Sequence, residues 1–303
     1  MVDFELIFET SERSDSVNHV RKILDRSTEF KFIDFEGYTV KNKKVTLLLD
    51  RAKYVLKPSS SNKYTPKDIY TYLCNKFQNT IDIKKHFAEK INVPWYFVIY
   101  GENETSIVLD MLNEGEKIHQ FRNFKELAEW TKEYRQYIMK SKFEEADQLP
   151  IIDKKMREIQ IPWPGNLDKA LCKDNNVIAL IEYQKTKKDK VRDHDNNKYF
   201  QNTYKKEIKN GQTNYSISRK GDEFRWKVLD EFSQQANLPI IVIVWSESEE
   251  VVGVKIIQEI KYTQWPSYSN PNPDNSDKGI IWGDVEYVDI SQVEETIKRM
   301  LKL

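Results

Sequence analysis

The chain has 303 residues, of which 39% are hydrophobic and 32% are charged, a composition that fits a folded globular protein and excludes wholesale disorder. Lysine plus arginine number 48, and aspartate plus glutamate also number 48, so the net charge gives no global signature of a nucleic-acid binder. The two cysteines, Cys74 and Cys172, exclude a disulfide framework and a cysteine-rich zinc cluster, and both are expected to be core thiols.

No secretion signal or membrane span is recognisable in the sequence. The first residues are acidic and lack a basic region followed by a long apolar stretch. The longest clean apolar run, LPIIVIVW at 238–245, is far shorter than the roughly 20 residues that cross a bilayer. We therefore expect a cytoplasmic protein that has no membrane partner.

The first half of the chain contains the parts of an α/β unit. Residues 87–104 (FAEKINVPWYFVIYGENE) predict the end of a helix, a stop at Asn92 and Pro94, and then a strand. Asn123 stands before FKELAEW and is expected to cap a further helix.

The second half shows a similar order of elements. Residues 176–183 (NVIALIEY) follow the turn letters KDNN and predict a buried strand. Residues 224–236 place apolar side chains at helical spacing, and Asn237 ends this helix before the apolar run at 238–245. The remaining expected elements are strands at 251–257 and near 280–288, and a final amphipathic helix capped by Asp289.

The two halves align without gaps over two segments, which indicates an internal repeat. Residues 33–50 align with the segment 132 positions later, and this alignment pairs Glu36 with Asp168 and Asp50 with Glu182. Each acid therefore has an acid at its matching position.

The second aligned segment starts at the helix end described above. Residues 87–104 align with the segment 145 positions later, which pairs Asn92 with Asn237 and Pro94 with Pro239. The alternative is that α/β proteins share such alternation by chance.

The repeat predicts an α/β fold of two similar units, each a mixed central sheet flanked by helices. The charged stretch at 141–150 is the expected linker, so we expect domains at residues 1–143 and 144–303.

The acids of the second copy are expected to share one site. Side chains alternate faces along a strand, so Glu182 and Gln184 point the same way. Asp168 and Glu182 are each seven residues from Asn175, so a simple hairpin places them opposite each other, within about 5.5 Å. Two such carboxylates suit a hard cation, Mg²⁺ or Mn²⁺. The alternative is a turn residue at 168 and a solvated strand-end acid at 182.

This pattern resembles the PD-(D/E)XK superfamily of restriction-endonuclease-like nucleases. The resemblance is carried by PGNLD at 164–168, by EYQ at 182–184, and by the order strand, strand, helix, strand that follows. It implies that Asp168 and Glu182 bind the metal and that Gln184 orients the attacking water. The family commonly has lysine where Gln184 stands, and a neutral amide cannot act as a base.

The lysine next to Gln184 leaves a second arrangement open. Lys185 would replace the missing lysine only if the strand register slipped or bulged. Two accessory residues are also candidates: Glu158 as an additional acid, and Trp163, which lies between two prolines, as a side chain that stacks on a base.

The first copy has Ala52 where the second has Gln184. We therefore expect a degenerate first copy, with Glu36 and Asp50 as its remaining equivalents, that binds or positions nucleic acid. Lys53 leaves open that this copy also cuts.

A basic stretch follows the candidate site. Residues 185–209 contain nine Lys/Arg and four Asp/Glu, a balance that can contact phosphates or can form a solvated charged loop. The candidate nucleic-acid-binding residues are Lys185, Lys187, Lys205, Lys206 and Arg225.

The sequence thus predicts an endonuclease that hydrolyses DNA phosphodiester bonds, and the resemblance implies a setting in restriction or phage defence. RNA as a substrate and a homodimer are left open. The alternatives are a catalytically inactive nucleic-acid-binding protein with a nuclease-like fold, and a structural or regulatory adaptor.

Overall fold

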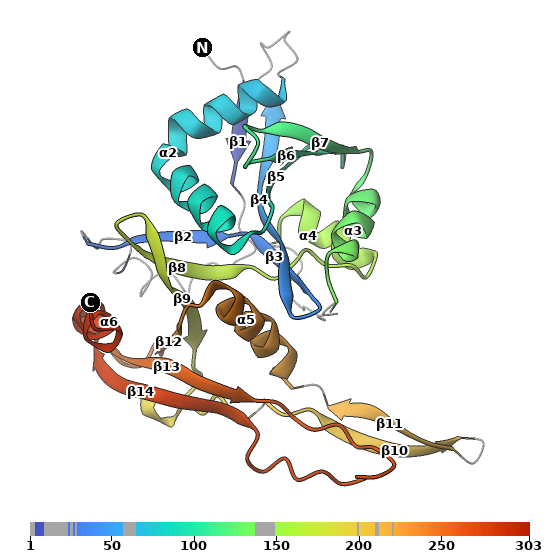
Figure 1. The fold of residues 1–303 in the computed structure, drawn as a ribbon, viewed down its shortest axis with the longest axis vertical. Coiled ribbons are helices and arrows are strands. Elements are labelled where there is room, and N and C mark those ends of the chain that lie inside the picture. Colours follow the sequence, from blue (N-terminus) through green and yellow to red (C-terminus); the bar gives the residue numbers. More distant parts are fainter. Residues whose placement is uncertain are drawn as a thin grey trace. The chain divides into compact units, whose positions relative to one another are not determined.

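The computed structural model describes residues 4–8, 24, 27, 29–56, 65–136, 149–198, 200–209, 212–219 and 221–303. This part of the chain has a mixed α/β fold in which helices flank the sheets, as the sequence predicted (Figure 1). The chain forms two compact units: unit 1 comprises residues 1–15 and 28–180, and unit 2 comprises residues 16–27 and 181–303. The second division falls inside a strand, whereas the predicted boundary at 143/144 lies outside the described residues.

The main sheet of unit 1 is built around one parallel pair of strands. Its order is β1 (Phe4–Ile7), β4 (Lys44–Leu56), β5 (Trp95–Tyr100), β6 (Ser106–Asp110) and β7 (Glu116–Phe121), and β3 (Gly37–Lys41) also pairs with β4. Strands β4 and β5 run parallel, and the other pairs of this sheet are antiparallel. The sheet is therefore mixed.

Helices cover both faces of this sheet. They are α2 (Pro66–Ile91), α3 (Phe124–Glu133) and α4 (Ile151–Glu158). Leu47 and Leu49 of β4 pack in one hydrophobic cluster with side chains of α3 and α4. Asp50 alternates with them and contacts Lys84 of α2, so α2 lies on the opposite face (Figure 1).

Unit 1 also holds the strands that lead into unit 2. Strand β2 (Lys31–Phe35) pairs antiparallel with β8 (Leu167–Lys173), and β8 turns into β9 (Asn176–Lys185). Because the units meet between residues 180 and 181, the first half of β9 belongs to unit 1 and the second half to unit 2.

Unit 2 continues the sheet order from β9 through β12 and β13 to β14. Its other elements surround these strands. They are η2 (Val191–Asp193), β10 (Thr203–Lys209), β11 (Gln212–Arg219), α5 (Glu223–Ala236), β12 (Ile240–Trp245), β13 (Val251–Lys261), β14 (Gly279–Asp289), η3 (Ile290–Gln292) and α6 (Val293–Leu301).

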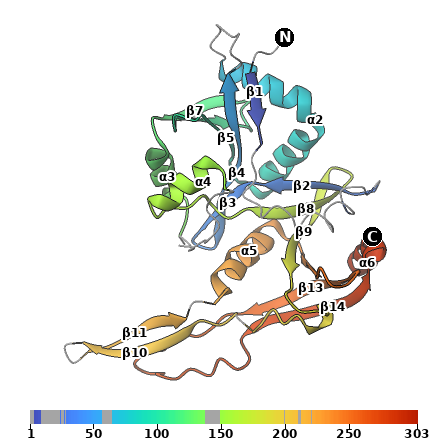
Figure 2. The ribbon, with the colours of Figure 1, turned by 180° about the vertical axis from the view of Figure 1, so that it is seen from behind.

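The predicted elements of the second half are confirmed, with two differences. The basic stretch includes an antiparallel hairpin, β10–β11, which extends away from the other strands of unit 2 (Figure 1, Figure 2). Asp289 precedes the short η3 turn and makes no capping hydrogen bond through its side chain, so the predicted cap is wrong. The predicted cap at Asn123 is confirmed, since its side chain accepts a hydrogen bond from the Glu126 amide at 3.0 Å.

The order of elements recurs along the chain. A hairpin, a helix, three strands and a helix appear first as β3–β4, α2, β5–β7 and α3, and again as β8–β9, α5, β12–β14 and α6. In both copies the hairpin turn is two residues long and left-handed, with φ of 54° and 62° at Asn42 and Lys43 and of 48° and 63° at Asp174 and Asn175. These turns lie 132 positions apart, at the predicted offset.

The helix ends recur as well. Asn92 ends α2 with φ 55° and ψ 52°, and Asn237 ends α5 with φ 52° and ψ 51°. Asparagine is one of the few residues other than glycine that adopt this left-handed conformation readily, which explains why it stands at both helix ends. The two caps are 145 positions apart, again at the predicted offset.

None of the helices in the described ranges is long and apolar enough to cross a bilayer.

Candidate functional site

The hairpin β8–β9 carries the predicted site residues. Asp168 lies on β8, half-buried, and the Asn166 side-chain amide donates to it at 3.4 Å. Glu182 and Gln184 lie on β9, on the same face of the strand. Asp168 belongs to unit 1 and Glu182 to unit 2, so the distance between their carboxylates stays a prediction from the sequence.

Glu182 is a buried carboxylate that has a cationic neighbour. Its exposed fraction is 5%, and Arg225 in the first turn of α5 forms an ion pair with its Oε1. Glu182 is thus a buried carboxylate that a half-exposed arginine neutralises.

Gln184 is held by a side chain that the sequence did not single out. The side-chain amide of Asn196, from the segment between β9 and β10, donates to Oε1 of Gln184. Asn196 in turn contacts Lys255 of β13.

The first copy places its acid pair on the equivalent hairpin. The register of β3 and β4 pairs Gly37 with Leu49, beyond a bulge between Thr39 and Val40. One residue further along, this register sets Glu36 opposite Asp50. The two acids of the first copy are close enough for the charge of Asp50 to raise the pKa of Glu36.

Asp50 already has a counter-charge within the protein. The Lys84 ammonium donates to both of its oxygens, at 2.8 and 2.9 Å, and Trp95 Nε1 donates to Oδ2 at 2.8 Å. Burial raises the pKa of Asp50, while Lys84 opposes that rise. The carboxylate is thus fully hydrogen-bonded without any metal.

Glu36 is less well compensated than Asp50. Burial raises its pKa to about 7; Arg51 opposes the rise, and Asp34 and Asp50 add to it. Arg51 Nε lies 3.8 Å from Glu36 Oε2, which is beyond hydrogen-bonding distance.

Arg51 is the centre of a second buried ion pair in unit 1. Its guanidinium donates to both oxygens of Asp153 at 2.8 and 2.9 Å and lies 4.7 Å from the centre of the Trp163 ring. Trp163 is buried, and its Nε1 donates to the Glu36 carbonyl at 2.8 Å. The structure thus accounts for Trp163 as a core side chain, not as an exposed platform for a base. Glu158 forms an ion pair with Lys155 at 3.3 Å on the surface of α4.

The two copies differ at the positions that neutralise the strand acid. The residues that match Lys84 and Trp95 at the offset of 145 are Leu229 and Ile240, neither of which can donate a side-chain hydrogen bond. The two copies share one register between these strands. Leu48 donates to the Pro94 carbonyl 46 positions on, and Thr186 donates to the Trp245 carbonyl 59 positions on, which is 46 plus the 13 by which the two offsets differ. Glu182 therefore lacks both partners that Asp50 has.

The candidate nucleic-acid-binding residues are spread over unit 2. Lys185 forms an ion pair with Glu247, and Lys205 forms one with Glu207 at 2.6 Å. Lys187 is exposed, and Lys206 lies opposite Tyr215 on the β10–β11 hairpin. Arg225 is half-exposed and contacts Glu182. Of this set, the structure brings Arg225 directly to a predicted site residue.

Two further observations concern binding capacity. Among the described residues, no three His, Cys, Asp or Glu side chains form a group that could hold a metal ion.

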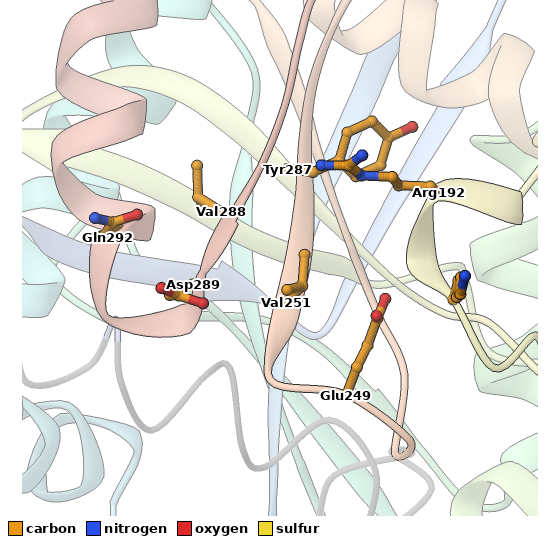
Figure 3. Close-up of a pocket in the computed structure, with 8 residues that line it drawn as sticks. Arg192, Glu249, Val251, Tyr287, Val288, Asp289 and Gln292 are labelled. Atoms are coloured by element: carbon orange, nitrogen blue, oxygen red, sulfur yellow. The ribbon is translucent and has the colours of Figure 1, made fainter.

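An open pocket of about 410 Å³ in unit 2 is lined by charged side chains of both signs, including Arg192, Glu249 and Asp289 (Figure 3). None of the predicted site residues lines this pocket.

Sequence reasoning missed Lys84, Trp95, Arg51 and Asp153 in unit 1, and Asn196 and Lys255 in unit 2. A position-by-position comparison of the copies would have found the first two, because each is a hydrogen-bond donor in one copy and apolar in the other. Arg51, Asp153, Asn196 and Lys255 have no comparable signal in the sequence.

Comparisons with known proteins assign no family. No family model matches the chain, and no curated protein matches it. One solved structure, described as "Crystal structure of Sex pheromone staph-cAM373 precursor", is matched with 11% sequence identity over 83% of this chain and 80% of that chain, at a TM-score of 0.15. A TM-score this low carries no argument about fold or function.

Proposed function

We propose that this protein is a divalent-metal-dependent endonuclease that hydrolyses DNA phosphodiester bonds, with Asp168 and Glu182 as its metal ligands. One observation supports this most: Glu182 is a buried carboxylate neutralised by Arg225, a half-exposed side chain that a metal ion could replace. Its counterpart Asp50 has two donors, Lys84 and Trp95. A bound cation in the second copy would take the place that Lys84 has in the first.

The residues available to hold that cation are hard oxygen donors. Carboxylates are the ligands that Mg²⁺ and Mn²⁺ favour, and two of them, completed by water and phosphate oxygens, suffice for Mg²⁺. When bound there, the metal would lower the pKa of a coordinated water and stabilise negative charge on the phosphate.

The neighbouring side chains have separate tasks in this proposal. Arg225 is half-exposed at the start of α5 and would bind a phosphate oxygen when the metal replaces it at Glu182. Gln184 is neutral and would position substrate or water by hydrogen bonding. The first copy, with its built-in lysine, would contribute nucleic-acid binding and not cutting.

The decisive experiment compares equivalent substitutions in the two copies. Wild type, Glu182→Gln and Asp50→Asn would be incubated with plasmid DNA in Mg²⁺ and in EDTA. We expect metal-dependent cutting by wild type, complete loss in Glu182→Gln, and retained cutting by the folded fraction of Asp50→Asn. Loss in Asp50→Asn with retention in Glu182→Gln would contradict the assignment of the active copy.

The second candidate function is nucleic-acid binding without catalysis. It is favoured by the Arg225–Glu182 ion pair, since an arginine already provides positive charge where the metal would bind. This candidate predicts that labelled DNA or RNA binds equally well in Mg²⁺ and in EDTA and is never cut. The same assay with RNA would identify the substrate class, and light scattering of the complex would show whether two chains are needed. A role in restriction or phage defence rests on the family resemblance alone.

A further inference from the structure

Lys255 of β13 is a buried lysine in an unusual environment. Its exposed fraction is 4%, and it forms no ion pair with a carboxylate in the part of the chain that the structure describes. Its ammonium donates to the His194 carbonyl and to Asn196 Oδ1, both at 3.4 Å, and lies 5.0 Å from the centre of the Trp282 ring. Burial lowers the pKa of Lys255, and Asp195 opposes that shift. A lysine buried at this cost is a candidate for a specific task.

The contact with Asn196 determines which way that amide group points. An ammonium has only donors, so the side chain of Asn196 must turn its oxygen toward Lys255. Its Nδ2 group then faces away and donates to Gln184 Oε1. Asn196 is itself 9% exposed, so it exchanges few of these hydrogen bonds with water.

The hydrogen bond from Asn196 in turn fixes the orientation of the Gln184 amide. Because its oxygen accepts from Asn196, the Nε2 group is the donor that Gln184 has left. Among the described residues, Nε2 has no hydrogen-bond partner, so its two hydrogens are available to a ligand. A group that can only donate cannot accept a proton or a hydrogen bond from water.

We propose that Lys255 is a positioning residue that, through Asn196, makes Gln184 a hydrogen-bond donor to an anionic oxygen of a bound phosphodiester. The choice of ligand rests on the proposed function; the orientation of the two amides does not. Gln184 then binds the substrate phosphate, a role different from the expected one of orienting the attacking water. This role also explains how glutamine serves at a position where lysine is common, since both side chains are donors there.

The orientation of the amides can be tested without substrate. Solvent exchange of the side-chain NH₂ signals would be measured by NMR, with the signals assigned by their loss in Gln184→Glu and Asn196→Asp. In wild type we expect a protected Asn196 amide and a rapidly exchanging Gln184 amide. Lys255→Met should expose the Asn196 amide, and Lys255→Arg should keep it protected. In Asn196→Asp, the new carboxylate only accepts, so the Gln184 amide should become protected.

The task of the donor is tested by affinity for a DNA duplex in Ca²⁺, which supports binding in place of Mg²⁺. We expect Lys255→Met to weaken binding by roughly tenfold, the size of one hydrogen bond to a charged group, and Lys255→Arg to weaken it much less. A protected Gln184 amide in wild type, or unchanged exchange in Lys255→Met, would overturn the proposed orientation. Equal affinities of folded Lys255→Met and wild type would overturn the phosphate contact. If wild type binds no DNA, the proposed function fails, while the exchange data still decide the orientation.

Discussion

Lys185, the last residue of β9, forms an ion pair with Glu247, which lies two residues beyond the end of β12. The first copy has the same pair at the matching positions, where Lys53 lies 2.9 Å from Glu102. Because the four residues follow both offsets of the internal alignment, the copies share side-chain contacts as well as the order of their elements. Lys185 is thereby engaged with Glu247, which argues against the alternative that it replaces the lysine missing at position 184.

The buried pair of Lys84 and Asp50 should be a major determinant of stability in unit 1. Lys84→Met leaves an uncompensated carboxylate in the core, and we expect it to lower the free energy of unfolding by about 3–5 kcal/mol. Urea unfolding measures this, with Lys90→Met at an exposed position of the same helix as the control. Adding Asp50→Asn to Lys84→Met should recover part of the loss. Equal stability of Lys84→Met and Lys90→Met would refute the expectation.

Glu36 should make stability depend on pH. Its pKa is raised from 4.5 to about 7, so between these values the folded state holds a proton that the unfolded chain has released. The contribution of Glu36 to stability is therefore complete below pH 4.5 and decreases as pH rises to about 7. Glu36→Gln stays neutral, so relative to wild type it should gain on the order of 2 kcal/mol between pH 5 and pH 8.

The measurement for Glu36 is urea unfolding of both proteins in EDTA at the two pH values. Titrations common to both proteins cancel in the difference. A difference that does not change with pH would show that Glu36 titrates normally.

Much of the fold was predictable because helix ends and turns depend on the conformation of a few neighbouring residues. Asn92 and Asn237 stop their helices through backbone conformation, and Pro94 and Pro239 follow them, so these boundaries are visible in the sequence. The β10–β11 hairpin was not predicted. Its polar and apolar residues alternate only in part, because Lys205 and Lys206 are two charged residues in a row, so the sequence does not show the two-residue period of a strand clearly.

The site was only partly predictable, for a different reason. That the acids of the first copy lie on the two strands of one hairpin could be predicted, because a hairpin is a local structure, but counting from the two-residue turn sets Glu36 opposite Leu49. Lys84, Asp153 and Lys255 reach their partners from distant elements, and a single sequence contains no rule for such contacts. The bulge between Thr39 and Val40, on which the pairing of Glu36 with Asp50 depends, is also invisible without the structure.

The left-handed cap at Asn237 gives a test of local geometry. Alanine at this position must adopt a positive φ, so we expect Asn237→Ala to cost about 1–2 kcal/mol. Asn237→Gly should cost less, because glycine adopts this conformation without strain. Thermal unfolding of the two variants side by side checks the order, and a more stable Asn237→Ala would contradict the structure at this position.

Arg225 should compete with metal for Glu182. Removing it by Arg225→Ala eliminates a positive charge at Oε1, and we expect Mn²⁺ affinity to increase by roughly three- to tenfold. Isothermal titration calorimetry measures this directly, with Glu182→Gln as the variant that should bind no Mn²⁺ at this site. Unchanged affinity in Arg225→Ala would show that metal and arginine use different positions.

The lysine that neutralises Asp50 is part of the polypeptide, so it stays in place however much free ion the surroundings supply. The positive charge next to Asp50 therefore does not depend on whether magnesium is present. Any response of the protein to the magnesium concentration would then originate in the second hairpin, and the first hairpin would not respond.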